Sequence, residues 1–448
     1  HPADGNTVLY DWEVNGVRRM YEEPSMPPPE TVLQHLVVST LPDWPAASRW
    51  YWQVSQAHLA ATSPEMGAVV RKLTAGASTD LQKITAVFYY VSKNIRYMGV
   101  TPETDRPGFE PHDVKLTFAK KYGVCRDKAA LLVAMLRMAG QQAYPVLINV
   151  GTKLDPEVPT PDFNHAVVAV ETSAGHYLLM DPTDEHTRKL LPAYDDDQSY
   201  LVCRPEGDVL RISPVTPPDE NLLQIATSGV LGPDGGLTAT SDISFAGVND
   251  DTYRGAFAEM KPDDQRRFFE TRLQQSIPGA RLTALRLSPE SMLDESAPLH
   301  VVLSYSAAAN AAFGGRRAVV EVPWIGRNLG VVNFILDGTG LAQRKYPLET
   351  QVACGIEEKI SLRLPEDFTR AVSLPASSTE DDDSVDYQRH FGIDGRTFQA
   401  SKRLALKVVE FSPAQYLDLK KALKNLQYDE RKAPVMATSE LPPAPRAV

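Results

Sequence analysis

The clearest pattern of apolar positions lies between residues 78 and 140. In "STDLQKITAVFYYVSKNI", apolar side chains recur every three or four residues, which predicts an amphipathic helix. Thr79 and Gln82 have the spacing of a capping box at its start. In "YGVCRDKAALLVAMLRMAG", residues 126–138 are apolar on nearly every side and stop before Gly140. Because such a helix has no polar face to turn toward water, we expect it to be buried.

Short apolar runs follow this helix and predict strands. They are "AYPVLINV", "FNHAVVAVE" and "HYLLMD", each rich in β-branched or aromatic residues. Helices followed by strands are typical of the α+β class. The sequence therefore predicts an α+β domain over residues 61–210.

The remainder of the chain is predicted to be mostly β. Residues 211–370 show the alternation of a β-sandwich domain, interrupted by one helix that starts near Pro262. Residues 371–430 predict an acidic loop, "SSTEDDDSVD", then a strand and a final helix that packs on the β-domain, with Ser412 as its N-cap. Residues 431–448 have the composition of a disordered tail.

Residues 1–60 also favour β-structure. "TVLYDWEVNGV" and "TVLQHLVVST" are rich in β-branched and aromatic residues. Two strands do not make a stable sheet alone. We therefore expect this segment to be the end of an incomplete N-terminal β-domain, and the chain, which begins with His and has no visible signal peptide, to be a mature form or a fragment.

Composition excludes several classes of protein. A chain of 448 residues is too long for one ordinary core. Its net charge of -11 argues against nucleic acid as a partner. Three cysteines are neither a disulfide framework nor a zinc site, and no Walker or dinucleotide-binding motif is present, so neither a metal nor a cofactor is expected. No apolar run is long enough to span a bilayer.

Cys125 stands at the start of the buried helix. The free N–H groups and the macrodipole there favour a thiolate, with Arg126 and Lys128 adding to this if they lean toward the sulfur. The alternative is an inert core thiol, since free cysteine is among the most buried residue types. The sequence around Cys125 does not decide between these readings by itself.

A predicted hairpin supports the reactive reading. A loop of three or four residues at "TSAG" pairs Glu171 with Gly175 or with His176. Either register brings His165 opposite Asp181 or one step away, where a carboxylate can orient the imidazole. A thiol, a base and an orienting acid then occur in the order Cys, His, Asp.

Three separated motifs carry a family resemblance. "YGVCRDKAALLVAMLRMAG", "FNHAVVAV" and "LLMDPT" resemble the transglutaminase-like superfamily over about residues 65–205. The closer likeness is to bacterial multidomain proteins that have a DUF3857-type N-terminal β-domain. This resemblance implies a papain-like fold for the core, with flanking β-sandwich-type domains.

The resemblance also implies functional roles. Cys125 is expected to be the nucleophile, His165 the general base and acid, and Asp181 the orienting group, with Tyr97 as a candidate oxyanion donor. The implied function is acyl transfer on protein or peptide amides through a thioester, as a peptidase, an amidase or a transglutaminase. A periplasmic or cell-surface location in a bacterium is expected, with the export signal outside this chain.

Two competing hypotheses remain open. One is a non-catalytic cell-envelope protein that binds or scaffolds a partner and keeps a vestigial triad. The other is arylamine-type acyl transfer, which uses the same three residue types, although the sequence "GVCRDKA" does not favour it.

The remaining polar candidates are predicted to be structural. Asn164 is expected to order the strand that carries His165. His112 is expected to be a loop histidine, and neither His176 nor His186 has an evident partner. The acidic runs "DDDQS" and "EDDDSVD" are expected to be solvated, and Cys203 and Cys354 to be core thiols.

Overall fold

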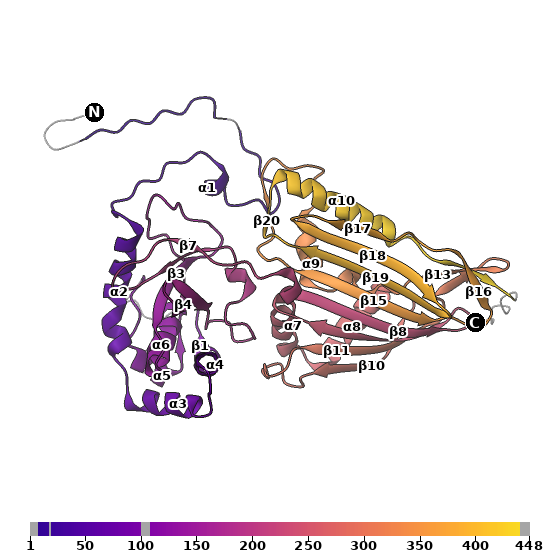
Figure 1. The fold of residues 1–448 in the computed structure, drawn as a ribbon, viewed down its shortest axis with the longest axis horizontal. Coiled ribbons are helices and arrows are strands. Elements are labelled where there is room, and N and C mark those ends of the chain that lie inside the picture. The colour runs from indigo at the N-terminus through magenta and orange to yellow at the C-terminus, as the bar shows by residue number, and fades with distance from the viewer. Residues whose placement is uncertain (1–7, 18, 100–107, 440–448) are drawn as a thin grey trace.

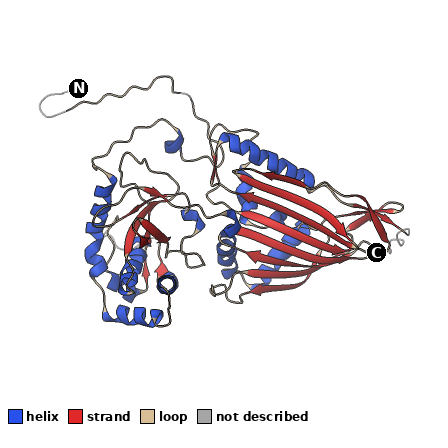
Figure 2. Cartoon of the chain, in the orientation of Figure 1, coloured by secondary structure: helices blue, strands red, loops and turns tan. Residues whose placement is uncertain are grey.

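The computed structural model describes residues 8–17, 19–99 and 108–439, which form two parts side by side (Figure 1). The N-terminal part (residues 44–212) contains a five-stranded sheet, and the C-terminal part (residues 222–438) contains an eight-stranded sheet. Helices dominate the first part and long strands the second (Figure 2). This mixture of helices and sheets confirms the predicted α+β class.

The N-terminal part is built from five main helices and an antiparallel sheet of order β5-β4-β3-β6-β7. The helices are α2 (Trp44–Ala60), α3 (Pro64–Thr74), α4 (Asp80–Asn94), α5 (Val114–Lys120) and α6 (Cys125–Met138). The strands are β3 (Ala143–Asn149), β4 (His165–Ser173), β5 (His176–Met180), β6 (Ser199–Val202) and β7 (Arg211–Ile212). A parallel pair, β1 (Arg96–Tyr97) and β2 (Tyr122–Gly123), and the short helix η1 (Ala193–Asp195) complete it.

Helix α6 is the centre of this part. Residues 129–136 are all buried, as the apolar pattern predicts, and they share a core with the side chains that β4 turns toward the helix. The Asp127 carboxylate accepts a hydrogen bond from the Val124 N–H (3.3 Å) and caps the first turn. At Gly123, a Cβ would lie 2.7 Å from the Asp127 Cβ, so only glycine lets the chain enter the helix this closely. The start of α6 is therefore held in a fixed position.

The C-terminal part is organised around the sheet β10-β11-β9-β8-β15-β19-β18-β17, antiparallel except where β8 pairs with β15. Its strands are β8 (Leu222–Leu231), β9 (Leu237–Phe245), β10 (Arg281–Ser288), β11 (His300–Ala307), β15 (Gly355–Arg363), β17 (Ser378–Asp381), β18 (Val385–Asp394) and β19 (Thr397–Leu406). A four-stranded sheet shares its core and contains β12 (Ala311–Phe313), β13 (Arg317–Val320), β21 (Val435–Thr438) and β16 (Phe368–Ser373). β14 (Leu348–Glu349) pairs with β20 (Glu410–Phe411).

Helices cover this sheet and connect its strands. They are α7 (Val248–Ala258), α8 (Pro262–Ser276), α9 (Val331–Ile335) and α10 (Pro413–Asp429), with the short helices η2 (Pro218–Asn221), η3 (Ile325–Asn328) and η4 (Leu336–Gly338). The structure confirms the start of α8 at Pro262 and the N-cap Ser412 of α10. The capping box of Thr79 and Gln82 is also present, at the start of α4. Helix α7 was not predicted.

The prediction of β-structure over residues 1–60 is wrong for the residues described. The described residues 9–17 and 19–43 contain no strand and only the short helix α1 (Pro29–Val32), and α2 follows directly. Asp43 caps α2 by accepting a hydrogen bond from the Ala46 N–H (2.7 Å). Further upstream, the Glu23 carboxylate binds the Lys345 N–H (2.9 Å), so this extended segment lies against the C-terminal part without joining a sheet.

Two C-terminal predictions are also corrected. The acidic run "SSTEDDDSVD" is a hairpin and not a loop, because it contributes to β17 and β18. The Asp382 carboxylate accepts hydrogen bonds from the N–H groups of Ser384 (2.7 Å) and Val385 (2.9 Å), which closes the turn. Within the predicted disordered tail, 435–438 form β21, while 440–448 lie outside the described residues. The predicted domain boundaries at 60, 210 and 370 stay predictions.

Candidate active site

Cys125 is the first residue of α6 and is partly exposed. The loop before α5 is tied to the same helix start, because the backbone N–H of His112 donates to the Asp127 carboxylate (2.9 Å) and its Nδ1 lies 3.1 Å from the same oxygen. His112, predicted to be a simple loop histidine, therefore helps to fix the turn that presents the thiol. Its separation of fifteen residues from Asp127 left no local signal in the sequence.

His165 and Asp181 are in direct contact. His165 Nε2 lies 3.0 Å from Asp181 Oδ2, and Asp181 is fully buried. Thr183 donates to Asp181 Oδ1 through its N–H (2.8 Å) and its hydroxyl (2.7 Å), and the Tyr194 hydroxyl donates to Oδ2 (3.1 Å). A buried carboxylate with this many donors is held as a fixed anion beside the imidazole.

The hairpin reaches this contact through a register that differs from the predicted one. Glu171 pairs with Tyr177, not with Gly175 or His176. The difference comes from a bulge between Glu171 and Ser173 and from a tight turn at Gly175, whose φ is 74°. Asp181 therefore lies just beyond the end of β5 and approaches His165 from a diagonal position.

The charges around His165 favour its protonated form. Burial alone would lower its pKa, but the hydrogen bonds to Asp181 and Cys125, together with the charges of both groups, raise the pKa to about 11. Burial likewise opposes ionisation of Asp181, yet His165 and Thr183 hold the pKa of Asp181 below its usual value. The imidazolium thus lies between the Cys125 sulfur and the Asp181 carboxylate.

Tyr97 lies beside the chain that leads into Cys125. It pairs with Gly123 in the parallel β1–β2 ladder, and its side chain is 39% exposed. The Tyr97 N–H donates to the Glu185 carboxylate (2.9 Å). Burial raises the pKa of Tyr97, and the charges of Cys125 and Asp181 add to this, so the phenol is close to the reactive groups.

Lys128 is fully buried on α6. Its ammonium donates to the Ser92 carbonyl (3.1 Å) on α4. Burial lowers the pKa of Lys128 to about 8, although the nearby carboxylates of Glu185, Asp181 and Asp184 oppose this. Lys128 therefore anchors α6 to α4.

Asp195 is the neighbour of the site that the sequence did not reveal. The prediction that "DDDQS" is solvated is wrong at Asp195 and Asp196, which are 0% and 1% exposed. One nitrogen of His165 and one carboxylate oxygen each of Asp181 and Asp195 lie within 4.8 Å of one another, a separation that could accommodate a metal ion. However, the oxygens of Asp181 already accept hydrogen bonds from His165, Thr183 and Tyr194.

A cavity of about 850 Å³ opens beside these residues. Tyr97 and Thr183 line it from the N-terminal part, and Met260 and Leu293 line it from the C-terminal part. Since Thr183 also donates to Asp181, the cavity extends to the immediate neighbours of the His165–Asp181 pair. Both parts of the chain thus form its walls.

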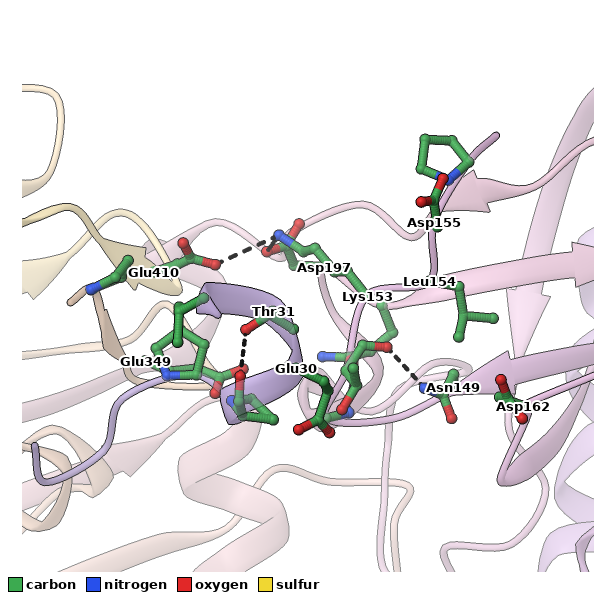
Figure 3. Close-up of a pocket in the computed structure, with 18 of the residues that line it drawn as sticks. Glu30, Thr31, Asn149, Lys153, Leu154, Asp155, Asp162, Asp197, Glu349 and Glu410 are labelled. Atoms are coloured by element: carbon green, nitrogen blue, oxygen red, sulfur yellow. Dashed lines mark hydrogen bonds and ion pairs between the residues drawn. The ribbon is translucent and has the colours of Figure 1, made fainter. Parts of the chain in front are cut away.

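A second cavity, of about 920 Å³, lies where residues 27–37 meet both parts of the chain (Figure 3). Lys153 extends into it and lies 2.6 Å from Asp197 and 3.9 Å from Glu410. Burial and the charge of Glu410 raise the pKa of Glu349 in its wall. This larger cavity has an acidic lining. Cys125, His165 and Asp181 line neither cavity, but only the cavity of about 850 Å³ is lined by Tyr97 and by Thr183, which bonds to Asp181.

The remaining sequence candidates are structural. Cys203 and Cys354 are confirmed as core thiols, both fully buried. The Asn164 side chain bonds both backbone polar groups of Val150 (2.8 and 2.9 Å), which confirms its role in ordering the strand. His176 is exposed at the start of β5.

Family comparisons agree with this arrangement. Residues 67–182 match the family model of the transglutaminase-like superfamily. The chain therefore contains a transglutaminase-like domain on a papain-like core, as the sequence motifs predict. Residues 333–435 match a domain of unknown function, DUF3858. The predicted resemblance to proteins with an N-terminal DUF3857-type domain is therefore corrected: the domain matched is DUF3858, and it lies in the C-terminal part.

Among similar solved structures is the crystal structure of a "putative protease" from Parabacteroides distasonis ATCC 8503. It is 13% identical, with a TM-score of 0.52 over 89% of this chain and 59% of that chain. This chain thus spans about three fifths of that protein, and the likeness concerns the fold. A "putative cysteine protease" from Cytophaga hutchinsonii is 22% identical over 31% of this chain and 43% of that chain, with a TM-score of 0.22.

The curated proteins include no match to this chain. In the part of the chain that the structure describes, none of the helices combines the length and the apolar character needed to cross a membrane.

Proposed function

We propose that this protein is a thiol enzyme that transfers acyl groups from protein or peptide amides through a thioester on Cys125. The observation that carries the proposal is the chain of contacts from Cys125 to His165 and from His165 to Asp181, at the N-terminus of a buried helix. A thiol, an imidazole and an orienting carboxylate are the groups that this chemistry requires.

In the proposed reaction, the Cys125 sulfur attacks the amide carbonyl carbon and forms a C–S bond. The carbonyl oxygen becomes an oxyanion, which we assign to the Cys125 N–H and the Tyr97 hydroxyl. When the intermediate collapses, the C–N bond breaks and His165 donates a proton to the leaving amine. Water or a second amine then attacks the thioester and forms a C–O or C–N bond, and His165 accepts the proton that the attacking group loses. The C–S bond breaks, which releases the acyl product and restores the Cys125 thiolate.

Substrate is proposed to bind in the cavity that Tyr97 shares with the C-terminal part. Its lining combines apolar side chains, Met260 and Leu293 among them, with the carboxylates of Glu185 and Glu290. A peptide segment presents both apolar and polar groups to such a surface. The product is set by the second attack: water gives a peptidase or amidase, and an amine gives a transglutaminase. An exported location, periplasmic or at the cell surface, belongs to the same proposal.

The first experiment measures the reactivity of Cys125 toward iodoacetamide near pH 6.5, with the modified peptides resolved by mass spectrometry. We expect Cys125 to react faster than an ordinary thiol, and His165→Ala to slow it by about a hundredfold because the imidazolium partner is lost. His176→Ala is the matched control, because His176 lies on the same hairpin but is exposed. The buried Cys203 provides an internal reference for the folded state.

The second experiment traps the acyl-enzyme. The protein is incubated with a peptide library, quenched in acid, and searched for added mass on the peptide that contains Cys125. Covalent adducts that disappear in Cys125→Ala support the enzyme. If Cys125 reacts like an unfolded thiol with or without His165, and no adduct forms, the alternative of a non-catalytic binding or scaffolding protein with a vestigial triad is correct.

A further inference from the structure

Asp195 is a buried carboxyl with an unusual environment. It lies at the end of η1 and is 0% exposed, and neither of its side-chain oxygens accepts a hydrogen bond from an N–H or O–H donor among the described residues. An ionised carboxylate in such a place loses its hydration without compensation, which costs several kcal/mol. The structure must therefore supply either a proton or a cation at this position.

The neighbours of Asp195 favour a proton. Side-chain oxygens of Asp181 and Asp195 lie within 4.8 Å of each other, and a hydrogen bond between the two carboxyls contributes to the raised pKa of Asp195. Two carboxyl groups can share a hydrogen bond only when one of them is protonated. Asp181 is the ionised partner, because His165, Thr183 and Tyr194 all direct N–H or O–H groups at it. The proton must then reside on Asp195.

Other charges around Asp195 lead to the same result. Asp196 follows it in the chain and is also buried, with its oxygens bonded to Thr216 (2.7 and 3.1 Å). Burial, followed by the charge of Asp181, raises the pKa of Asp195 to about 8, and His165 only partly offsets this. Lys189 pairs directly with Glu220, and its charge contributes to lowering the pKa of Asp196. Among the described groups, no cation pairs directly with Asp195.

We propose that Asp195 is a neutral carboxylic acid that donates its hydrogen to the Asp181 carboxylate and thereby positions Asp181 against His165. The triad thus extends through a fourth residue, in the order Cys125, His165, Asp181, Asp195. Asp195 touches neither the sulfur nor the substrate in this arrangement, so it is a positioning residue. The positioning role of Asp195 rests on the proposed function, whereas the protonation of Asp195 does not.

The proton is tested directly by infrared difference spectroscopy of the full chain, wild type against Asp195→Asn, from pH 5 to 10. At pH 6 we expect the wild type to show the carbonyl stretch of a protonated carboxyl that the variant lacks, and to lose it as the pH rises through about 8. Asp383→Asn, at an exposed carboxylate in the β17–β18 turn, is the control and leaves this band in place. A band that is absent at pH 6, or that appears only after dialysis against EDTA, would overturn the proposal, the latter by identifying a bound cation.

The positioning role is tested by the alkylation of Cys125 with iodoacetamide at pH 6. Asp195→Ala removes the donor, and we expect the rate to fall about tenfold. Asp195→Asn retains an N–H donor without a charge and should restore most of that rate, while Asp196→Asn and Asp196→Ala leave it alone. If the alkylation rate falls equally in both Asp195 variants, or falls in neither, the result contradicts positioning by a shared hydrogen.

These readouts separate the two proposals. The infrared band needs no catalysis, so it survives if no acyl-enzyme is ever trapped. Conversely, an acyl-enzyme on Cys125 in a protein without the band would support the enzyme and reject the role of Asp195. If Asp195→Ala does not fold, the infrared band of the wild type still tests the protonation of Asp195. The alkylation rate of Cys125 in Asp195→Asn still tests its positioning role.

Discussion

Two groups of buried charges, one in each part of the molecule, are arranged in different ways. In the C-terminal part, the guanidinium of Arg254 is completely buried and fully bonded: it holds the Asp250 carboxylate (2.6 and 3.2 Å) and three backbone carbonyls. Lys402 is similarly held by Glu358 (3.5 Å) and Glu430 (3.0 Å). In both places each buried cation is paired directly with carboxylates.

In the N-terminal part, the buried ionisable groups do not close into simple pairs. His165 contacts both Cys125 and Asp181, while the side-chain partner of Asp195 is another carboxyl, that of Asp181. The resulting pKa displacements of His165 and Asp195 lie around one partly exposed cysteine. The comparison teaches that burial of charge does not mark a site; unbalanced charge beside a reactive atom does.

The largest expected effect comes from breaking a closed pair. Asp250→Ala leaves the buried Arg254 without its counter-ion, and we expect the free energy of unfolding to fall by about 3–5 kcal/mol. Urea denaturation measures this. Asp264→Ala removes an exposed partner of Arg267 and should cost under about 1 kcal/mol. Cys125 alkylation in the folded Asp250 variant should be unchanged; a large loss would mean that the two parts are coupled.

The next effect concerns the pH dependence of stability. Because the pKa of Asp195 is raised from the usual value for aspartate to about 8, the folded state keeps a proton that the unfolded chain releases between about pH 4 and 8. Stability contributed at this residue therefore falls as the pH rises through that window. Asp195→Asn lacks this loss.

We expect the free energy of unfolding of Asp195→Asn to gain about 3–4 kcal/mol relative to that of the wild type between pH 5 and pH 8, and little further above that range. Urea denaturation at several pH values checks it. Asp383→Asn, which alters an exposed carboxylate in the β17–β18 turn, is the control and should show no such trend. A stability gap that is constant with pH would mean that Asp195 is ionised in the folded protein.

The sequence predicts the residues of the candidate site better than it predicts their surroundings. Cys125, His165 and Asp181 were predicted although the hairpin register was wrong. The true register differs by two residues from that of the three-residue loop, and an even shift keeps each side chain on its face of the sheet. An odd shift would have turned Asp181 away from His165.

Asp195 and the N-terminal segment were beyond prediction for a shared reason. The run "DDDQS" has the local composition of a solvated loop, and its burial comes from packing against residues distant in sequence, such as Ser213, whose hydroxyl accepts from Gln198 (2.8 Å). Residues 31–40 have strand propensity but no partner strand in the described chain. The helices α4, α8 and α10 are predictable because their start signals are local: capping boxes in α4 and α10, and a first-turn proline in α8.

The third prediction tests whether unbalanced charge at this site serves catalysis. Tyr97→Phe removes a hydroxyl proposed to bind the oxyanion, and we expect kcat/KM for a trapped peptide substrate to fall about 10–100-fold with KM little changed. Tyr428→Phe, on exposed α10, is the matched control. If KM rises and kcat stays, Tyr97 contacts the ground-state substrate and another group must bind the oxyanion.

The smallest expected effect tests whether the C-terminal part contributes to catalysis at all. Leu293 is 62% exposed in the wall of the cavity beside Tyr97, so an aspartate there should be accommodated without unfolding. We expect Leu293→Asp to raise KM for a peptide substrate about 3–10-fold, because apolar contact is lost. Iodoacetamide is too small to require contact with the cavity wall. The rate at which it alkylates Cys125 in this variant should therefore match that of the wild type. Leu417→Asp, at a similarly exposed leucine on α10 outside the cavity, controls for added charge. An unchanged KM would confine substrate to the N-terminal part and leave the charges of the C-terminal part with a purely structural role.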